Sequence, residues 1–194
     1  MSDHESVWNE ENAEWYVANY GEHISNALTI KNAGLKKDDH LLDIGCGSGA
    51  ACREAIKFIT KGSIIGIDPT PAMIRFAIEK TDDPSIQYME GSAEDIPLKD
   101  DSVTICTAIN SLHHWSDHES GFREIQRVLK PNGRLIISDE IVDGGTCGHG
   151  DGPLSDPEKV INELEKVGFT DVSLERHEKD GEEIYMFRAK NISS

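Results

Sequence analysis

A glycine-rich turn between an apolar strand and a helix is the feature that most constrains this fold. The segment 43–49 reads Asp-Ile-Gly-Cys-Gly-Ser-Gly and continues the apolar run 40–44. Three spaced glycines permit a tight turn and let the backbone approach a ligand at the N-terminus of the next helix. About 20 residues further on, Asp68 ends a second apolar run, where a carboxylate can accept hydrogen bonds from ribose hydroxyls. Together these features predict an α/β domain that binds an adenosine-containing ligand.

Short apolar runs alternate with helical patterns from about residue 39 onward, which predicts βαβ units and a mostly parallel sheet. The expected strands are 40–44, 63–68, 86–89, 103–109 and 134–138. Helices are expected at 49–60, 117–129 and 155–167. A further helix is expected to start with Thr70 as its N-cap and Pro71 at its first position. Lys130–Gly133 is expected to form a turn before the fifth strand. Two last strands, 171–176 and 183–188, flank the turn 179–181. We therefore expect seven strands, with an antiparallel hairpin at the C-terminal end.

The first 38 residues are predicted to form a helical cap segment, with helices at 10–20 and 24–33. A length of 194 residues fits one structural unit, with residues 39–194 as its ligand-binding domain. The aromatic residues of the cap either pack against that domain or cover the ligand as a lid. They are Trp8, Trp15, Tyr16 and Tyr20.

The charge of the chain argues against nucleic acids and anionic membranes as partners. The formal net charge is −17, and no cluster of lysine and arginine stands out. The sequence has no apolar run of the roughly 20 residues that a bilayer requires. Its polar, acidic start at 1–6 is unlike a signal peptide, so a cytoplasmic location is expected. Four free thiols are expected as well, at Cys46, Cys52, Cys106 and Cys147.

Four sequence blocks identify the type of adenosine ligand. The glycine loop alone also satisfies the looser dinucleotide fingerprint, through Gly45, Gly47 and Ala50. However, the chain resembles the class I, Rossmann-like S-adenosylmethionine-dependent methyltransferases, especially the small-molecule branch that includes quinone-biosynthesis enzymes. The matching blocks are 42–49, 66–74, 91–98 and 102–135. The resemblance implies an α/β three-layer sandwich, S-adenosylmethionine as cofactor, S-adenosylhomocysteine as product, and a small-molecule methyl acceptor.

The resemblance also implies a set of cofactor-binding residues. The glycine loop would wrap the methionine part of the cofactor, with Asp43 oriented toward its amino group and Asp68 on the ribose hydroxyls. Ser92 replaces the family's usual aspartate near adenine, which predicts a weaker contact because a hydroxyl carries no charge. Thr104 stands where many relatives have aspartate. The full expected set is Asp43, Gly45, Cys46, Gly47, Asp68, Pro69, Met73, Ser92, Ala93, Glu94, Ala108 and His113.

Methyl transfer from a sulfonium is an in-line displacement that depends mainly on the alignment of the acceptor. This explains why the family has no universal catalytic residue, and the catalytic residues of this chain are left open. His113 is assigned a structural or cofactor-side role rather than a catalytic one, while His114, Asp139 and Glu140 are further candidates near the acceptor. No metal is expected, because the possible ligands show no recognised spacing and surround a glycine-rich loop at 144–152. Those possible ligands are Asp139, Asp143, Cys147, His149 and Asp151.

Two alternative functions share part of this pattern. A nicotinamide-dependent oxidoreductase would also use the glycines and Asp68, but the sequence has no recognisable catalytic Tyr-x-x-x-Lys pair and no second domain. A protein that binds the cofactor without turnover would keep the same loop. The sequence predicts neither the acceptor nor the oligomeric state.

Overall fold

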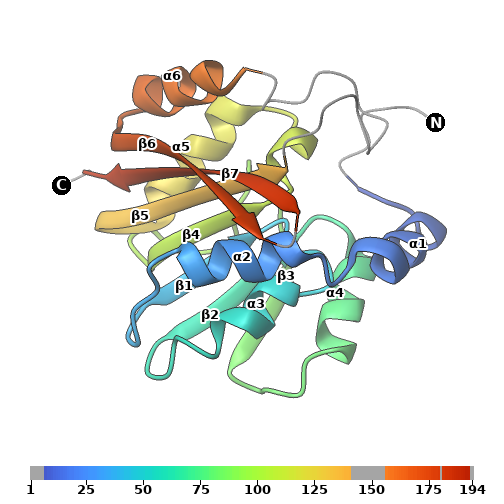
Figure 1. Cartoon of the computed structure of the whole chain (residues 1–194). Helices are drawn as coiled ribbons and strands as arrows, with labels where there is room; N and C mark the ends of the chain where they lie inside the picture. Colours follow the sequence, from blue (N-terminus) through green and yellow to red (C-terminus); the bar gives the residue numbers. More distant parts are fainter. Residues whose placement is uncertain (1–6, 141–155, 180, 193–194) are drawn as a thin grey trace.

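A central sheet with helices on both faces organises the molecule (Figure 1). The computed structural model describes residues 7–140, 156–179 and 181–192. The strands are β1 (His40–Ile44), β2 (Ser63–Asp68), β3 (Ile86–Glu90), β4 (Val103–Ile109), β5 (Leu129–Glu140), β6 (Phe169–Lys179) and β7 (Glu182–Asn191). The helices are α1 (Glu10–Tyr20), α2 (Ile24–Asn32), α3 (Ala50–Ala55), α4 (Pro71–Glu79), α5 (His118–Val128) and α6 (Pro157–Val167), with a 3-10 helix at Leu112–His114.

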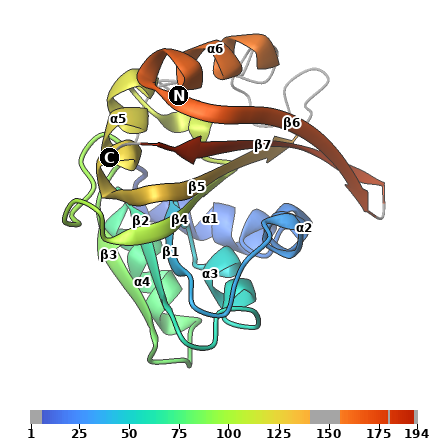
Figure 2. The same cartoon turned by 90° about the vertical axis from the view of Figure 1, so that its left-hand side faces the viewer.

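Within the described residues the sheet has seven strands in the order β3-β2-β1-β4-β5-β7-β6. Strands β1 to β5 are parallel, and β7 is antiparallel to both β5 and β6. The predicted α/β sandwich with a C-terminal antiparallel hairpin is therefore confirmed. The β6–β7 hairpin curves away from the rest of the sheet at its turn end (Figure 2).

The strand order creates a switch point between β1 and β4. The chain builds outward from β1 to β3 and then returns, so that β4 pairs with the other side of β1. Helix α3 follows β1 and packs on one face of the sheet, whereas α5 follows β4 and packs on the opposite face. Chains that leave neighbouring strands toward opposite faces open a crevice at the carboxyl edge, where open α/β sheets bind ligands.

The core consists of two apolar layers, one on each face of the sheet. Along β1, Leu41 packs in the layer beneath α2 and α3, and Leu42 packs in the layer beneath α5 and α6. Both leucines are fully buried, as expected for a parallel strand that is covered on both faces. Ile30 of α2 and Phe122 of α5 are among the large buried side chains that close these layers.

The N-terminal helices pack in different places. Ala13 of α1 contacts Ala72 and Met73 of α4, while α2 lies against α3 and the sheet. Helix α2 therefore forms part of a layer that covers the sheet. The division of the chain into a cap at 1–38 and a domain at 39–194 stays a prediction. No helix in the described part of the chain has the length and apolar character that a bilayer crossing requires.

Two predicted details of the elements are wrong. The helix expected at 49–60 ends at Ala55, because the amides of Thr60 and Lys61 both donate to the carbonyl of Lys37 and draw the chain out of the helix. The fifth strand begins at Leu129 rather than 134, and residues 130–133 bulge between two positions that both pair with β4.

Thr70 occupies the N-cap position of α4, with Pro71 directly after it, as predicted. Its Oγ1 makes no capping bond and instead accepts a hydrogen bond from the amide of Trp8 at 3.1 Å. This contact ties the N-terminal segment to the loop after β2.

Thr104 supplies a structural hydrogen bond although it replaces the family's aspartate. Its Oγ1 donates to Asp39 Oδ1 at 2.8 Å and accepts from the amide of His40 at 2.9 Å. Asp39 also pairs with Arg134 at 2.5 Å. The start of β1 is therefore anchored to β4 and β5 by this group.

Candidate functional site

A cavity lies at the carboxyl edge of the sheet, where β1, β2 and β4 end. Its empty space is about 900 Å³, including the part that is open to solvent. The loops after β1 to β4 contribute lining residues, and so does the N-terminal segment between Trp8 and Asn26. This is the crevice that the strand order creates.

The glycine loop forms one wall, and its conformation requires glycine. Gly45, Gly47 and Gly49 have φ angles of 70°, 51° and 82°, in the left-handed region that side chains disfavour. A Cβ at Gly45 would lie 2.5 Å from the Cβ of Ser111, whereas a Cβ at Gly47 would meet no atom within 4 Å. Gly47 lines the cavity, so its backbone presents an open surface that a ligand can approach closely.

Asp68 connects the glycine loop to the next loop from the end of β2. Its Oδ2 accepts from the amide of Gly47 at 3.0 Å, and its Oδ1 accepts from the amide of Thr70 at 2.9 Å. Burial raises the pKa of Asp68 to about 6, although both hydrogen bonds act in the opposite direction. The carboxylate thus shapes two loops and lines the cavity between them.

Asp43 lies behind the glycine loop and does not line the cavity. It is 2% exposed and accepts hydrogen bonds from Thr107 Oγ1 at 2.6 Å and from Cys52 Sγ at 3.7 Å. Burial raises the pKa of this carboxyl to about 7. Its expected orientation toward the cofactor's amino group stays a prediction.

Glu94 and its neighbours form the wall after β3. Glu94 Oε1 accepts from the amide and hydroxyl of Ser116, at 2.8 and 2.9 Å, and from the amide of Asp117 at 3.2 Å. Burial alone would raise the pKa of Glu94, but these hydrogen bonds outweigh it and lower the pKa below its ordinary value. Glu94 is therefore ionised at neutral pH, and it fastens this wall to the start of α5.

The structure brings together nine of the twelve residues expected to bind the cofactor. Besides Asp43, neither Ala108, which is fully buried in β4, nor His113 lines the cavity. The nine that line it are Gly45, Cys46, Gly47, Asp68, Pro69, Met73, Ser92, Ala93 and Glu94.

Several lining residues are outside the set expected to bind the cofactor, and most of them come from two segments. After β4, His114 rather than His113 reaches the cavity, together with Asn110, Ser111 and Trp115. His114 is one of the candidates predicted near the acceptor, and for the other three the position at the carboxyl end of β4 was the signal in the sequence. The N-terminal segment adds Trp8, Tyr16, Tyr20, Gly21 and Asn26.

Three of the four aromatic residues in the described N-terminal segment line the cavity, and Trp15 does not. Tyr16 and Tyr20 line the cavity, and Trp8 packs edge-on against Tyr16 with ring centroids 4.8 Å apart. Trp15 does not line the cavity and is 60% exposed.

Some expected groups lie outside the described residues. These are Asp143, Cys147, His149, Asp151 and the glycine-rich loop 144–152. Asp139 and Glu140 are in β5, but their side chains are outside the described part as well. The other three cysteines are buried free thiols.

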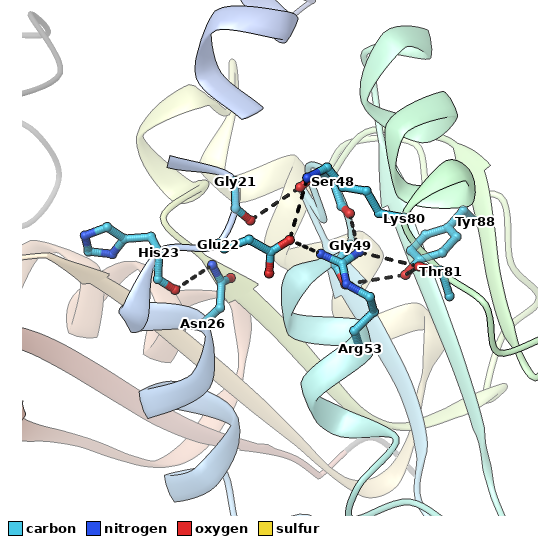
Figure 3. A network of polar contacts seen from close by, with 10 residues as sticks. All are labelled: Gly21, Glu22, His23, Asn26, Ser48, Gly49, Arg53, Lys80, Thr81 and Tyr88. Carbon is cyan, nitrogen blue, oxygen red and sulfur yellow. Dashed lines mark hydrogen bonds and ion pairs between the residues drawn. The ribbon is translucent and has the colours of Figure 1, made fainter. Parts of the chain in front are cut away.

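Arg53 of α3 joins the glycine loop to the junction between α1 and α2 (Figure 3). Its Nη1 donates to the carbonyl of Ser48 at 2.6 Å, and its Nη2 donates to Glu22 Oε1 at 2.5 Å. Ser48 Oγ also donates to the carbonyl of Gly21 at 3.3 Å. Two side chains therefore hold this junction against the loop that lines the cavity.

Replacing Arg53 with methionine is expected to loosen this junction. Amide hydrogen exchange at Gly21 and Glu22 should accelerate about tenfold, since each lost charge-assisted bond in a partly exposed pair contributes roughly 1 kcal/mol. Hydrogen exchange read by mass spectrometry measures this change. Lys57→Met is the matched control, because it removes only an exposed ion pair with Glu54. Equal exchange at the junction in both variants would contradict the assigned role.

The charge of the lining is one-sided. Among the residues that the structure describes, no lysine or arginine lines the cavity, whereas the carboxylates of Asp68 and Glu94 do. Such a site suits a ligand with a positive centre and has no lysine or arginine to offer a pyrophosphate.

A family model described as a methyltransferase domain matches residues 42–137. This stretch contains most of β1 and β5, all of β2, β3 and β4, the glycine loop and Asp68. Residues 42–137 of this chain therefore form a methyltransferase domain.

Proteins that are similar in sequence to this chain include several methyltransferases. An uncharacterized methyltransferase of Bacillus subtilis, YcgJ, is 35% identical over 58% of this chain and 45% of its own length. The 27-O-demethylrifamycin SV methyltransferase of Amycolatopsis mediterranei is 32% identical over 70% of this chain and 50% of its own length. A 2-phytyl-1,4-naphtoquinone methyltransferase of a Nostoc species is 32% identical over 61% of this chain and 55% of its own length. The chain thus spans about half the length of these relatives.

Solved structures of methyltransferases share the fold. Phosphoethanolamine N-methyltransferase 2 of Haemonchus contortus, in complex with phosphomonomethylethanolamine and S-adenosylhomocysteine, superposes with a TM-score of 0.77 at 20% identity, covering 96% of this chain and 59% of that one. A S-adenosylmethionine-dependent methyltransferase of Aquifex aeolicus superposes with a TM-score of 0.75 at 22% identity, covering 95% and 100%.

Proposed function

We propose that this protein binds S-adenosylmethionine and transfers its methyl group to a small-molecule acceptor. The observation that carries the proposal is a cavity that combines Asp68, an exposed glycine-loop backbone and carboxylates without lysine or arginine, as far as the structure describes the lining. The cofactor carries a sulfonium, whereas a nicotinamide dinucleotide carries a pyrophosphate. The carboxylates suit the sulfonium. Because the amides of a glycine loop at a helix N-terminus can bind a pyrophosphate without lysine or arginine, titration with both ligands separates the two.

The residues present fit the adenosyl cofactor. Asp68 would accept hydrogen bonds from the ribose hydroxyls, and the wall formed by Ser92, Ala93 and Glu94 would meet adenine. Gly47 would lie against the methionine part, since a Cβ at this position would enter the open space of the cavity. Asp43, Ala108 and His113 do not line the cavity, but their predicted roles in cofactor binding remain part of the proposal.

The chemistry that the cofactor supplies is an activated methyl group on a good leaving group. The protein's part is to align the acceptor and exclude water, which can supply much of the rate. Tyr16 and Tyr20 of α1 line the side of the cavity formed by the N-terminal segment, where they would cover bound reactants. Relatives named for rifamycin and naphthoquinone substrates support a small-molecule acceptor. A cytoplasmic location and the exclusion of nucleic acids belong to the same proposal, supported by the net charge of −17.

Isothermal titration with three ligands tests the cofactor assignment. S-adenosylmethionine and S-adenosylhomocysteine should bind in the micromolar range, and NAD should not bind. Binding of NAD alone would support the oxidoreductase alternative. Transfer of radiolabelled methyl groups to a broad set of small acceptors then separates an enzyme from a protein that binds the cofactor without turnover.

Cofactor affinity should fall as the pH is lowered below about 6. The pKa of Asp68 is about 6 because of burial, and its protonated form loses the charge that strengthens bonds from ribose hydroxyls. The decline should approach roughly tenfold per pH unit below that pKa. Asp43, whose pKa is about 7, titrates in the same range, so the wild type is compared with Asp68→Asn by titration calorimetry from pH 5 to 8. The same pH slope in both proteins would contradict the assignment.

A further inference from the structure

We propose that the methyl acceptor of this protein carries no net negative charge, so that neutral and cationic acceptors are selected over anionic ones. The inference rests on the proposed function and specifies the substrate class of the same cavity. It follows from three features: the charge of the lining, the composition of the remaining segments, and the aromatic rings on one wall.

Among the basic side chains that the structure describes, only the imidazole of His114 lines the cavity, so an anionic group would have no lysine or arginine to bind it. Asp68 and Glu94 line the cavity, and the part of the lining that the structure describes contains neither lysine nor arginine. An anion that leaves water must be paired or hydrogen-bonded to offset its lost hydration, and nearby carboxylates add repulsion.

The segments outside the described residues add no lysine or arginine. Residues 1–6 and 141–155 contain no lysine or arginine in the sequence. Their charged residues are Asp3, Glu5, Asp143 and Asp151, with His4 and His149 as the only basic groups.

Basic residues on the helices beside the cavity are already engaged in other contacts. Arg53 donates to Ser48 and Glu22, and Arg75 of α4 pairs with Glu10 and Glu79. A change of side-chain rotamer at either arginine would break these bonds before it could serve an anionic acceptor.

Aromatic rings on the same wall favour a neutral or positive group. Trp8, Tyr16 and Tyr20 line the cavity, with Tyr16 and Tyr20 ring centroids 5.6 Å apart. Aromatic faces carry negative partial charge, so they attract cations and pack well against uncharged apolar groups. The wall thus supports the selection that the carboxylates impose.

Two acceptor series, each with one shared nucleophile and a second group of varied charge, test the proposal. Tyramine, para-ethylphenol and para-hydroxyphenylpropionate share one phenol, and cysteamine, mercaptoethanol and mercaptoacetate share one thiol. In radiolabelled methyl transfer, kcat/KM for the cationic or neutral member should exceed that of the anionic member at least tenfold. A preference for the carboxylate in a series that turns over would overturn the proposal.

A charge-insertion variant sharpens this test. Asn26 lines the cavity, so Asn26→Lys should narrow the discrimination against the carboxylate at least tenfold. Asn19→Lys adds the same charge on the exposed part of α1 and should leave the discrimination unchanged. Equal effects of the two variants would show that the selection does not arise in the cavity.

Quenching of Trp8 fluorescence by charged ions tests the charge of the cavity without requiring methyl transfer. The double variant Trp15→Phe/Trp115→Phe keeps only Trp8, and its fluorescence should be quenched more strongly by caesium than by iodide. The double variant Trp8→Phe/Trp115→Phe keeps only the exposed Trp15 as a control. The ratio of caesium quenching to iodide quenching should be larger for Trp8 than for Trp15. Equal quenching of Trp8 by the two ions, including no quenching by either, would overturn the proposal. Cofactor titration is measured separately, so a protein that fails to bind S-adenosylmethionine disproves the proposed function while quenching still reports the cavity's charge.

Discussion

Asp68→Ala is expected to weaken S-adenosylmethionine binding by roughly a hundredfold, which corresponds to about 3 kcal/mol. The substitution removes charge-assisted hydrogen bonds to the ribose hydroxyls. It also releases the amides of Gly47 and Thr70, which the two carboxylate oxygens hold at 3.0 and 2.9 Å. Cofactor binding would therefore lose both a direct contact and the shape of two loops that line the cavity. Titration calorimetry with S-adenosylmethionine and S-adenosylhomocysteine measures the loss.

Glu90→Ala is the matched control for this prediction. Glu90 ends β3 directly beside Asp68 in the sheet register, but it is exposed and does not line the cavity. It should leave affinity within about twofold of the wild type, because it removes a solvated carboxylate. Thermal unfolding of both variants reports whether each protein is folded during the titration. Unchanged affinity in a folded Asp68→Ala protein would show that the cofactor does not bind at the end of β2.

Alanine at Gly45 and at Gly47 should have different consequences, although both positions are in the same loop. At Gly45 the new Cβ would lie 2.5 Å from the Cβ of Ser111, with a φ of 70°. Overlap and a left-handed backbone together should cost about 2–5 kcal/mol of the free energy of unfolding. At Gly47 only the backbone conformation opposes alanine, which should cost about 1–2 kcal/mol.

Cofactor binding separates the two variants. Gly47→Ala should stay folded and lose S-adenosylmethionine binding at least tenfold, because its methyl group projects into open space that the cofactor would occupy. Denaturant unfolding gives the stability of each variant, and calorimetry gives the affinity. If Gly47→Ala bound the cofactor as tightly as the wild type, the methionine part would not lie against this loop.

Local patterns were sufficient to predict the elements that hold the cofactor loops. Leu41 and Leu42 point to opposite faces of β1, and both are buried, which is why a continuous apolar run indicated a strand within a parallel sheet. The glycines of segment 43–49 were predictable because their left-handed φ angles are a local requirement. Asp68 was predictable because the end of a strand next to the switch point has a defined place in the fold.

Element boundaries depended on distant contacts instead. Helix α3 ends at Ala55 because a carbonyl of Lys37 captures the amides of Thr60 and Lys61, and no pattern within the helix shows this. The choice between His113 and His114 had the same origin. A 3-10 helix spans 112–114, and its orientation decides which of two adjacent imidazoles reaches the cavity.

The sequence by itself determined the class of the fold, the glycine loop and the acid at the end of β2, because these follow from periodicity and backbone conformation within short segments. Only the tertiary structure decided which aromatic residues of α1 reach the cavity and that Asp43 stands behind the loop rather than in the lining. It also decided that the lining, as described, contains carboxylates and no lysine or arginine. The physical reason is that a site's charge is set by side chains from several elements, and their meeting point depends on how those elements pack.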